Sequence, residues 1–147
     1  MTNTIAKTIE LAAPIDRVWR ALTDYQEFGA WFRVKLAAPF AVGVTASGHI
    51  AYPGYEHLAW NAHVTAMAPY HFAFTWHPYA VDPAQDYTAE TPTLVSFRLE
   101  ETPNGTRLLL TESGFDKIPP HRMPEALRMN DNGWAEQIQN IKAHVEK

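Results

Sequence analysis

The chain has 147 residues, 46% of them hydrophobic and 12% aromatic, and a formal net charge of −4. A chain of this length and apolar content is typical of one globular domain, residues 1–147, and excludes a disordered protein. The chain has no cysteine, which excludes disulfides, thiolate zinc sites and cysteine-ligated iron–sulfur clusters. No cluster of Lys and Arg interrupts the sequence, so we expect no nucleic-acid partner.

Targeting signals are not apparent. The N-terminal stretch MTNTIAKTIELAAP has no basic segment followed by an apolar run, unlike a secretory signal peptide. No run of about 18 apolar residues is long enough to span a membrane. We therefore expect a cytoplasmic protein.

The N-terminal elements are predicted to be one strand and two helices. Residues 4–11 have the composition of a strand, and Pro14 suits the first turn of a helix that runs to about Thr23. Thr23 or Asp24 is positioned to cap a second short helix, which ends near Gly29.

The middle of the chain, from about residue 33 to 114, is predicted to form strands. The turn signal Asn104-Gly105 and several short turns between segments favour antiparallel pairing. The expected strands are RVKLAA (33–38), VTASGHIAY (44–52), HLAWNAHVTAM (57–67), residues 70–77, TLVSFRLEE (93–101) and TRLLLTES (106–113).

The C-terminal segment, from about residue 123 to 145, is predicted to form one long amphipathic helix. Four poor helix formers in its middle, Asn130 to Gly133, indicate a kink or a break there. The order of elements favours an α+β fold with helices on one face of the sheet. A strongly curved sheet around one helix encloses a cavity unless very large side chains fill it. The apolar stripe of the helix consists of Met123, Leu127, Trp134, Ile138, Ile141 and Val145.

Several stretches resemble a known superfamily. They are APIDRVWRALTD (13–24), FGAWF (28–32), FAFTW (72–76), NGTRLLLTESGF (104–115) and NGWAEQIQNIKAHV (132–145). The chain resembles the START-like, birch-pollen-allergen-like helix-grip superfamily, also called SRPBCC, and within it the branch named for the activator of the heat-shock-protein-90 ATPase. The resemblance implies a curved antiparallel sheet of about six to seven strands around a long C-terminal helix, with two short helices after the first strand. It also implies an apolar cavity for lipids, polyketides or other small hydrophobic molecules; some members are cyclases or hydrolases, and others only bind.

The segment HFAFTWHPYAVD (71–82) carries alternating rings. In a strand Phe72, Phe74 and Trp76 point to one face, and we expect that face to be the inner one because burying three rings is strongly favourable. His71 and His77 then lie mainly on the outer face. Two interpretations remain open: the rings pack as core, or they line a ligand cavity.

Metal and cofactor chemistry are not expected. His49, His57 and His63 lie in different strand regions without the close spacing of metal ligands. The residues around Ser113 do not form a nucleophile elbow, and no dinucleotide-binding fingerprint is present.

Glu112 is the most informative polar residue. Alternation places it on the inner face with Leu108 and Leu110, where a carboxylate is costly unless it is paired or protonated. One interpretation pairs it with a backbone amide or an arginine such as Arg128. The other makes it a polar anchor or a general acid/base in the cavity.

Asn130 lies on the apolar stripe of the C-terminal helix between Leu127 and Trp134. Its side chain is expected to make a polar contact either with a ligand group or with Glu112. Alternatively, it caps a break in the helix. Tyr52 is expected to contribute a hydroxyl to the same space.

Residues 78–92 form a long proline-containing segment without a strand or helix pattern. Loops of this length are uncommon in compact domains unless they act as lids or contacts. We expect a cavity lid or a homodimer contact, against a plain surface loop.

The sequence therefore favours binding of a small hydrophobic or aromatic molecule between sheet and helix. The alternatives are an enzyme of cyclase or hydrolase type with Glu112 as acid/base, and a co-chaperone-like protein-interaction domain. Identity of the ligand and oligomeric state are not fixed by these patterns. The expected ligand-binding residues are Trp31, Tyr52, Trp60, Phe72, Phe74, Trp76, Phe97, Leu110, Glu112, Phe115, Asn130, Trp134 and Ile138.

Overall fold

The computed structural model describes residues 3–82 and 84–147. In these described residues, seven strands and three α-helices follow one another in the order expected from the sequence, and one short 3-10 helix that was not predicted precedes the last helix. The elements are β1 (Thr4–Leu11), α1 (Ile15–Thr23), α2 (Tyr25–Phe32), β2 (Val34–Leu36), β3 (Thr45–Ile50), β4 (Ala59–Ala68), β5 (His71–Trp76), β6 (Thr93–Thr102), β7 (Gly105–Ser113), η1 (Phe115–Lys117) and α3 (Met123–Val145).

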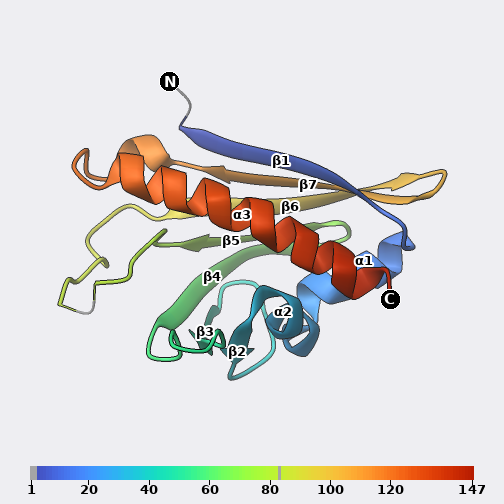
Figure 1. The fold of residues 1–147 in the computed structure, drawn as a ribbon, viewed down its shortest axis with the longest axis horizontal. Coiled ribbons are helices and arrows are strands. Elements are labelled where there is room, and N and C mark those ends of the chain that lie inside the picture. The colour runs from blue at the N-terminus through green and yellow to red at the C-terminus, as the bar shows by residue number, and fades with distance from the viewer. Residues whose placement is uncertain (1–2, 83) are drawn as a thin grey trace.

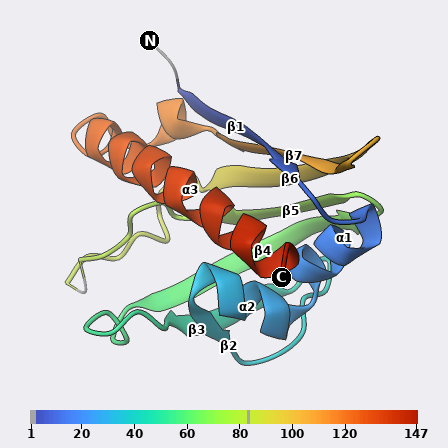
Figure 2. The same ribbon diagram turned by 45° about the vertical axis from the view of Figure 1, so that its right-hand side comes forward.

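All strands belong to one antiparallel sheet with the order β1-β7-β6-β5-β4-β3-β2. The sheet curves around α3, which runs diagonally across its concave face (Figure 1). The turned view shows α1 and α2 at the end of the sheet near the C-terminus of α3 (Figure 2). This is the α+β helix-grip architecture that the sequence predicted. No described helix is long and apolar enough to cross a membrane.

The second short helix begins at the predicted cap Asp24, but its predicted end near Gly29 is wrong, because α2 continues to Phe32. The carboxylate of Asp24 accepts hydrogen bonds from the backbone N–H groups of Gln26 and Glu27, at 2.9 and 3.1 Å, so it caps α2. The chain leaves α2 through Arg33, whose φ of 68° is left-handed. Gly29 matters for packing, because a Cβ there would lie 2.4 Å from the carbonyl oxygen of Val34.

The inner face of the sheet is built from alternating large side chains. Phe72 and Phe74 of β5 are fully buried and pair across the sheet with Phe97 and Val95 of β6. The ring centroids of Phe72 and Phe97 lie 6.1 Å apart. The rings of Phe72, Phe74 and Trp76 contact one another in turn, as expected if they share one face. His71 and His77 are half-buried and Ala73 is buried, so burial in β5 does not follow strict alternation.

The long C-terminal helix is continuous, so the predicted kink or break at residues 130–133 is wrong. Helix propensities are weak, and contacts with the rest of the fold override them. Asn130 donates to Glu112 at 3.0 Å, and Lys7 forms an ion pair with Asp131 at 2.9 Å. Both contacts hold the helix against the sheet at the point where its intrinsic propensity is lowest.

A charge cluster holds the C-terminal end of α3 against α1 and α2. Glu27 accepts hydrogen bonds from Arg17 at 2.7 Å, Arg20 at 2.6 Å and His144 at 3.0 Å. Partial burial of the Glu27 carboxyl raises its pKa, but hydrogen bonds from His144, Arg17 and Arg20 outweigh it and lower the pKa to about 2. The folded state therefore favours ionised Glu27.

Replacing Glu27 by Gln is expected to cost about 1 kcal/mol of unfolding free energy at pH 7, after allowance for solvent screening. Because the folded pKa of Glu27 is depressed from 4.5 to about 2, its contribution is present above pH 4.5. That contribution is lost as the pH falls toward 2. Urea unfolding of both proteins at pH 7, 4 and about 2 measures this, with E125Q as the exposed control. A difference that stayed constant across these pH values would contradict the assignment.

Candidate functional site

A buried carboxylate lies between the sheet and the first half of α3. Alternation along β7 carries Glu112 to the inner face, as predicted, and its side chain is 0% exposed. On the neighbouring strand Val95 pairs with Glu112. Thr93, two residues before Val95, is on the same face and also buried.

Four side chains from three elements donate hydrogen bonds to this carboxylate. Oε2 accepts from the indole Nε1 of Trp76 at 2.7 Å and from the hydroxyl of Thr93 at 2.6 Å. Oε1 accepts from the indole Nε1 of Trp134 at 2.8 Å and from the amide of Asn130 at 3.0 Å. Asn130 and Trp134 are four residues apart on α3, so they share one helix face. We call these five residues the Glu112 cluster.

The Glu112 cluster decides between the interpretations of the sequence. The prediction that an arginine such as Arg128 pairs with Glu112 is wrong. Arg128 lies on the outer side of α3, where it is exposed and pairs with Glu125 at 3.7 Å. The predicted contact between Asn130 and Glu112 is confirmed. The alternative role of Asn130 as the cap of a broken helix is wrong, since α3 continues past it.

The cluster contains no cation. Within residues 3–82 and 84–147, none of the ion pairs includes Glu112. Indole and amide N–H groups only donate, and an ionised carboxylate only accepts, through about four lone-pair sites. The number and kind of donors therefore match the ionised form of Glu112, and the low local dielectric strengthens each bond.

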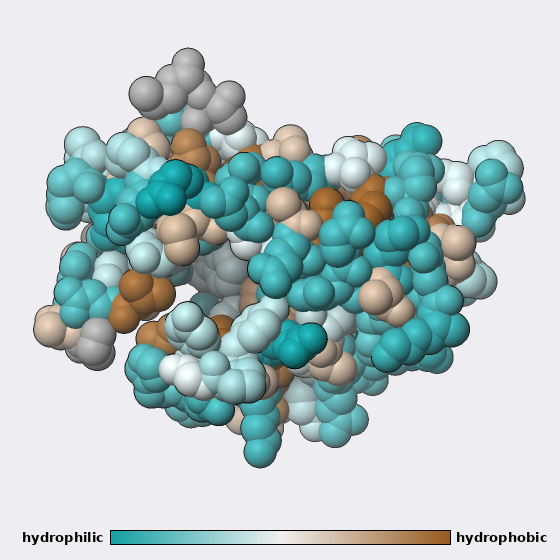
Figure 3. Space-filling view, in the orientation of Figure 1, coloured by the Kyte–Doolittle hydropathy of each residue, from teal (hydrophilic) through white to brown (hydrophobic). Residues whose placement is uncertain are grey.

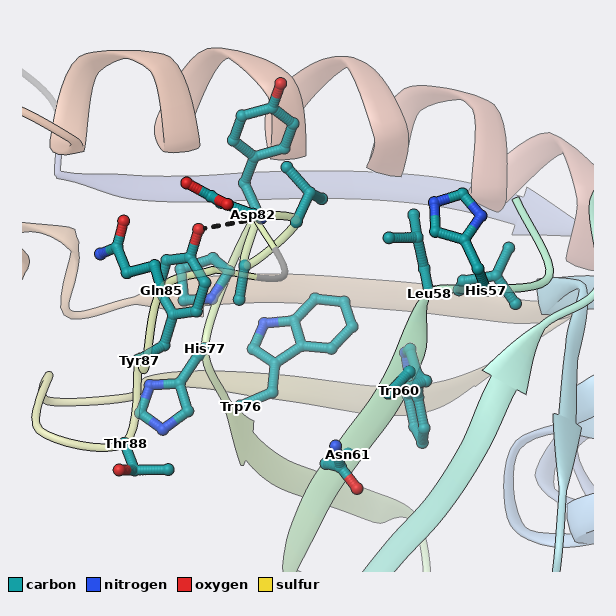
Figure 4. Close-up of a pocket in the computed structure, with 16 residues that line it drawn as sticks. His57, Leu58, Trp60, Asn61, Trp76, His77, Asp82, Gln85, Tyr87 and Thr88 are labelled. Atoms are coloured by element: carbon teal, nitrogen blue, oxygen red, sulfur yellow. Dashed lines mark hydrogen bonds between the residues drawn. The ribbon is translucent and has the colours of Figure 1, made fainter. Parts of the chain in front are cut away.

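Two pockets adjoin the Glu112 cluster, with volumes of about 480 and 460 Å³. Pocket 1 lies between β4, the end of β5 and residues 77–88, and pocket 2 lies between the β3–β4 turn and α3. They meet at Ile50, Leu58 and Trp76, which line both. Figure 3 shows a hollow in this part of the surface with hydrophobic residues at its edges. Figure 4 shows Trp76 and Trp60 inside pocket 1.

The residues expected to bind a ligand fall into three groups. Tyr52, Trp60, Trp76, Asn130 and Trp134 line one or both pockets. Glu112 lines neither pocket, and it lies behind Trp76 and Trp134 as their acceptor. The remaining residues pack in the hydrophobic core outside both pockets: Trp31, Phe72, Phe74, Phe97, Leu110, Phe115 and Ile138.

The segment from 78 to 92 is fixed to the start of α3 by one arginine. The guanidinium of Arg122 donates to Glu90 at 3.0 Å and to the backbone carbonyls of Pro78 and Tyr79 at 2.8 and 3.0 Å. It also lies over the ring of Tyr87, 4.8 Å from its centroid. The Arg122 and Glu90 side chains are only 10% and 9% exposed. Described residues of this segment, among them Pro78, Tyr79 and Tyr87, form one wall of pocket 1.

Replacing Arg122 by Lys is expected to lower the unfolding free energy by about 1–2 kcal/mol. Lysine keeps the charge but lacks the planar fork that reaches the carboxylate and both carbonyls together. Thermal unfolding measures the loss, and limited proteolysis measures faster cleavage within residues 78–92. R128K on the exposed side of α3 is the control, because Arg128 is exposed and forms an ion pair with Glu125 there. Equal stability and cleavage of both variants would contradict this role.

The histidines do not converge on a metal site. The described part of the chain contains no group of three His, Asp or Glu side chains close enough to hold a metal ion. His71 lies on the outer face, where its Nε2 and the hydroxyl of Ser96 are 2.8 Å apart. Burial, followed by the charge of Arg98, lowers the pKa of His71.

Comparison with known proteins places the chain in a family. Residues 12–146 match the family model described as Activator of Hsp90 ATPase homolog 1-like protein. The chain belongs to this family. A search of curated proteins finds no match for the chain.

Solved structures show that other proteins share the fold of this Hsp90-activator-like family member. A protein from Mesorhizobium loti is 25% identical, with a TM-score of 0.75 over 96% of this chain and 95% of that chain. DynU16, described as a putative protein in the dynemicin biosynthetic locus, is 20% identical, with a TM-score of 0.75. The match covers 100% of this chain and 48% of that chain. The Aha1 dimer from Colwellia psychrerythraea is 18% identical, with a TM-score of 0.72 over 99% of this chain and 97% of that chain.

Sequence reasoning missed two parts of the site in this family member. Thr93 has a signal in the sequence, because it precedes Val95 and Phe97 in the same alternation and so falls on the inner face. Arg122 has none, because it lies just before α3 and its partners are 32 to 44 residues away along the chain.

Proposed function

We propose that this protein binds a small, largely apolar aromatic molecule in pockets 1 and 2. The observation that carries the proposal is the pair of adjoining pockets lined by rings, including Trp60, Trp76 and Trp134. Volumes of about 480 and 460 Å³ fall in the range that holds small organic ligands. Among the lipid and polyketide classes implied by the family resemblance, ring-lined walls favour molecules that contain rings.

The Glu112 cluster supports this proposal because it fixes the walls in place. Trp76 and Trp134 both donate to Glu112, and their ring centroids lie 5.7 Å apart with planes inclined by 31°. Indoles held by buried, charge-assisted hydrogen bonds lose little further freedom when a ligand binds. Such preorganisation lowers the free-energy cost of binding.

The same geometry disfavours Glu112 as a general acid or base. A catalytic carboxyl must come within hydrogen-bond distance of the proton that it transfers. Glu112 is 0% exposed, lines neither pocket and accepts bonds from four side chains. We therefore propose that Glu112 is a positioning residue for the aromatic wall.

A second candidate function, contact with another protein, is favoured by the rim of the pockets. Tyr55 and Met129 beside pocket 2 and Val81 beside pocket 1 are exposed large hydrophobic residues. An exposed apolar rim is typical of a contact surface, and the similar Aha1 protein was solved as a dimer. Sedimentation of the chain alone tests self-association, and a monomer at all concentrations would remove the homodimer.

Native mass spectrometry of the protein purified from its host tests the leading proposal. We expect a retained small molecule, or, after mild stripping, binding of a naphthalene-type probe with micromolar affinity. The absence of both would contradict binding in these pockets.

A further inference from the structure

We propose that pocket 1 recognises a carbonyl oxygen of an uncharged aromatic ligand through the indole N–H of Trp60. This inference rests on the proposed function and names the chemical class of its ligand. It starts from a donor that has no partner among the residues that the structure describes.

Trp60 differs from Trp31, Trp76 and Trp134, whose indole N–H groups all have acceptors. The indole N–H of Trp31 donates to the carbonyl of Ala21 at 2.8 Å, and those of Trp76 and Trp134 donate to Glu112. Trp60 is only 5% exposed, yet its Nε1 has no partner among the described residues. Buried indole N–H groups usually have an acceptor, so this one requires an explanation.

Trp60, which carries this donor, is one of the residues that line pocket 1. Figure 4 shows Trp60 beside Trp76, with its nitrogen on the edge toward Leu58. The structure describes three buried side-chain polar atoms without partners, and two of them, Trp60 Nε1 and His77 Nδ1, belong to residues that line this pocket. Because two unpartnered atoms belong to residues that line one pocket, we infer that a ligand supplies the missing polar groups.

The charges around the pockets select an uncharged acceptor. The described residues that line pockets 1 and 2 include Asp82 and Glu136 but no Lys or Arg. A ligand carboxylate would lose its hydration there without gaining a counter-charge. A carbonyl costs less to bury and accepts a hydrogen bond from an N–H group as well. The rings of Trp76, Tyr79 and Tyr87 in the same lining favour an aromatic body.

A matched pair of probes tests this assignment. Methyl naphthyl ketone and isopropenylnaphthalene have nearly the same shape, but only the ketone accepts a hydrogen bond. We expect the ketone to bind roughly tenfold more tightly, since a buried hydrogen bond distinguishes them. We also expect one of the five tryptophan indole N–H resonances, that of Trp60, to move in the NMR spectrum with the ketone only.

Trp60→Phe keeps a ring and removes the donor. We expect this variant to bind both probes with the affinity that the wild type shows for the hydrocarbon. Trp19→Phe is the matched control, because Trp19 packs against Tyr70 with centroids 5.8 Å apart and lines neither pocket. The Trp19→Phe variant should keep the roughly tenfold preference for the ketone over the hydrocarbon.

The outcomes separate this inference from the function on which it rests. Equal affinity of the wild type for both probes, with no shift of the Trp60 N–H resonance, would overturn the inference and leave the binding function standing. Binding of neither probe would overturn the binding function as well. If Trp60→Phe does not fold, the ratio of wild-type affinities for the two probes and the shift of the Trp60 N–H resonance still test the proposed hydrogen bond.

Discussion

Replacing Glu112 by Gln is expected to lower the free energy of unfolding by about 2–4 kcal/mol, the largest stability effect that we expect from an isosteric change in this protein. Glu112 is fully buried, and both of its oxygens accept hydrogen bonds. A glutamine supplies one oxygen and one NH₂ group. Whichever way the amide is oriented, its NH₂ group faces an indole N–H, and two donors then oppose each other.

The loss of stability also follows from the positions of the hydrogen-bond donors to Glu112 in the fold. Trp76 is on β5, Thr93 on β6 and Trp134 on α3, so Glu112 joins the helix to three adjacent strands. An unpaired buried N–H group costs about 1–3 kcal/mol. We expect Trp76 and Trp134 to become more mobile, with a red shift of tryptophan fluorescence.

Urea unfolding of E112Q measures the effect, and E101Q is the control. Glu101 lies on β6, is exposed and forms no ion pair among the described residues. Its replacement should change stability by less than about 0.5 kcal/mol. Equal stabilities of the two variants would show that the Glu112 cluster does not hold the helix to the sheet.

Replacing Gly133 by Leu is expected to weaken binding of an aromatic probe by at least about tenfold without loss of stability. Gly133 lines pocket 2, and a Cβ added there meets no heavy atom within 4 Å. The leucine side chain would therefore enter open space instead of clashing with the core. Because glycine is a poor helix former, the same change should raise the unfolding free energy by up to about 1 kcal/mol.

Ala135→Leu is the matched control, since Ala135 is exposed on α3 and lines neither pocket. It places the same leucine side chain on α3 without filling pocket 2. Calorimetric titration with a naphthalene-type probe and thermal unfolding of both variants give affinity and stability separately. Unchanged affinity in the Gly133 variant would place the ligand outside pocket 2, whereas lost stability would show that the helix cannot accept the side chain.

The limits of sequence reasoning are clearest at α3. The poor helix formers from Asn130 to Gly133 predicted a break, but the helix is continuous. Propensity describes the isolated segment, while the contacts of Asn130 with Glu112 and of Asp131 with Lys7 exist only after the sheet has formed. The apolar stripe, by contrast, correctly identified the face of α3 that packs inward, because helical periodicity is local.

The sequence by itself determined the order of the elements, the antiparallel meander, the family resemblance and the inward direction of Glu112. Each follows from patterns within a few residues, namely strand alternation, helical spacing, caps and turn residues. Only the tertiary structure decided that four side chains meet at one carboxylate, namely Trp76, Thr93, Asn130 and Trp134. It also decided that Trp60, beside a pocket, has no acceptor within residues 3–82 and 84–147. Those facts depend on the register between distant strands and on the placement of α3 across them, and short-range patterns do not specify either one.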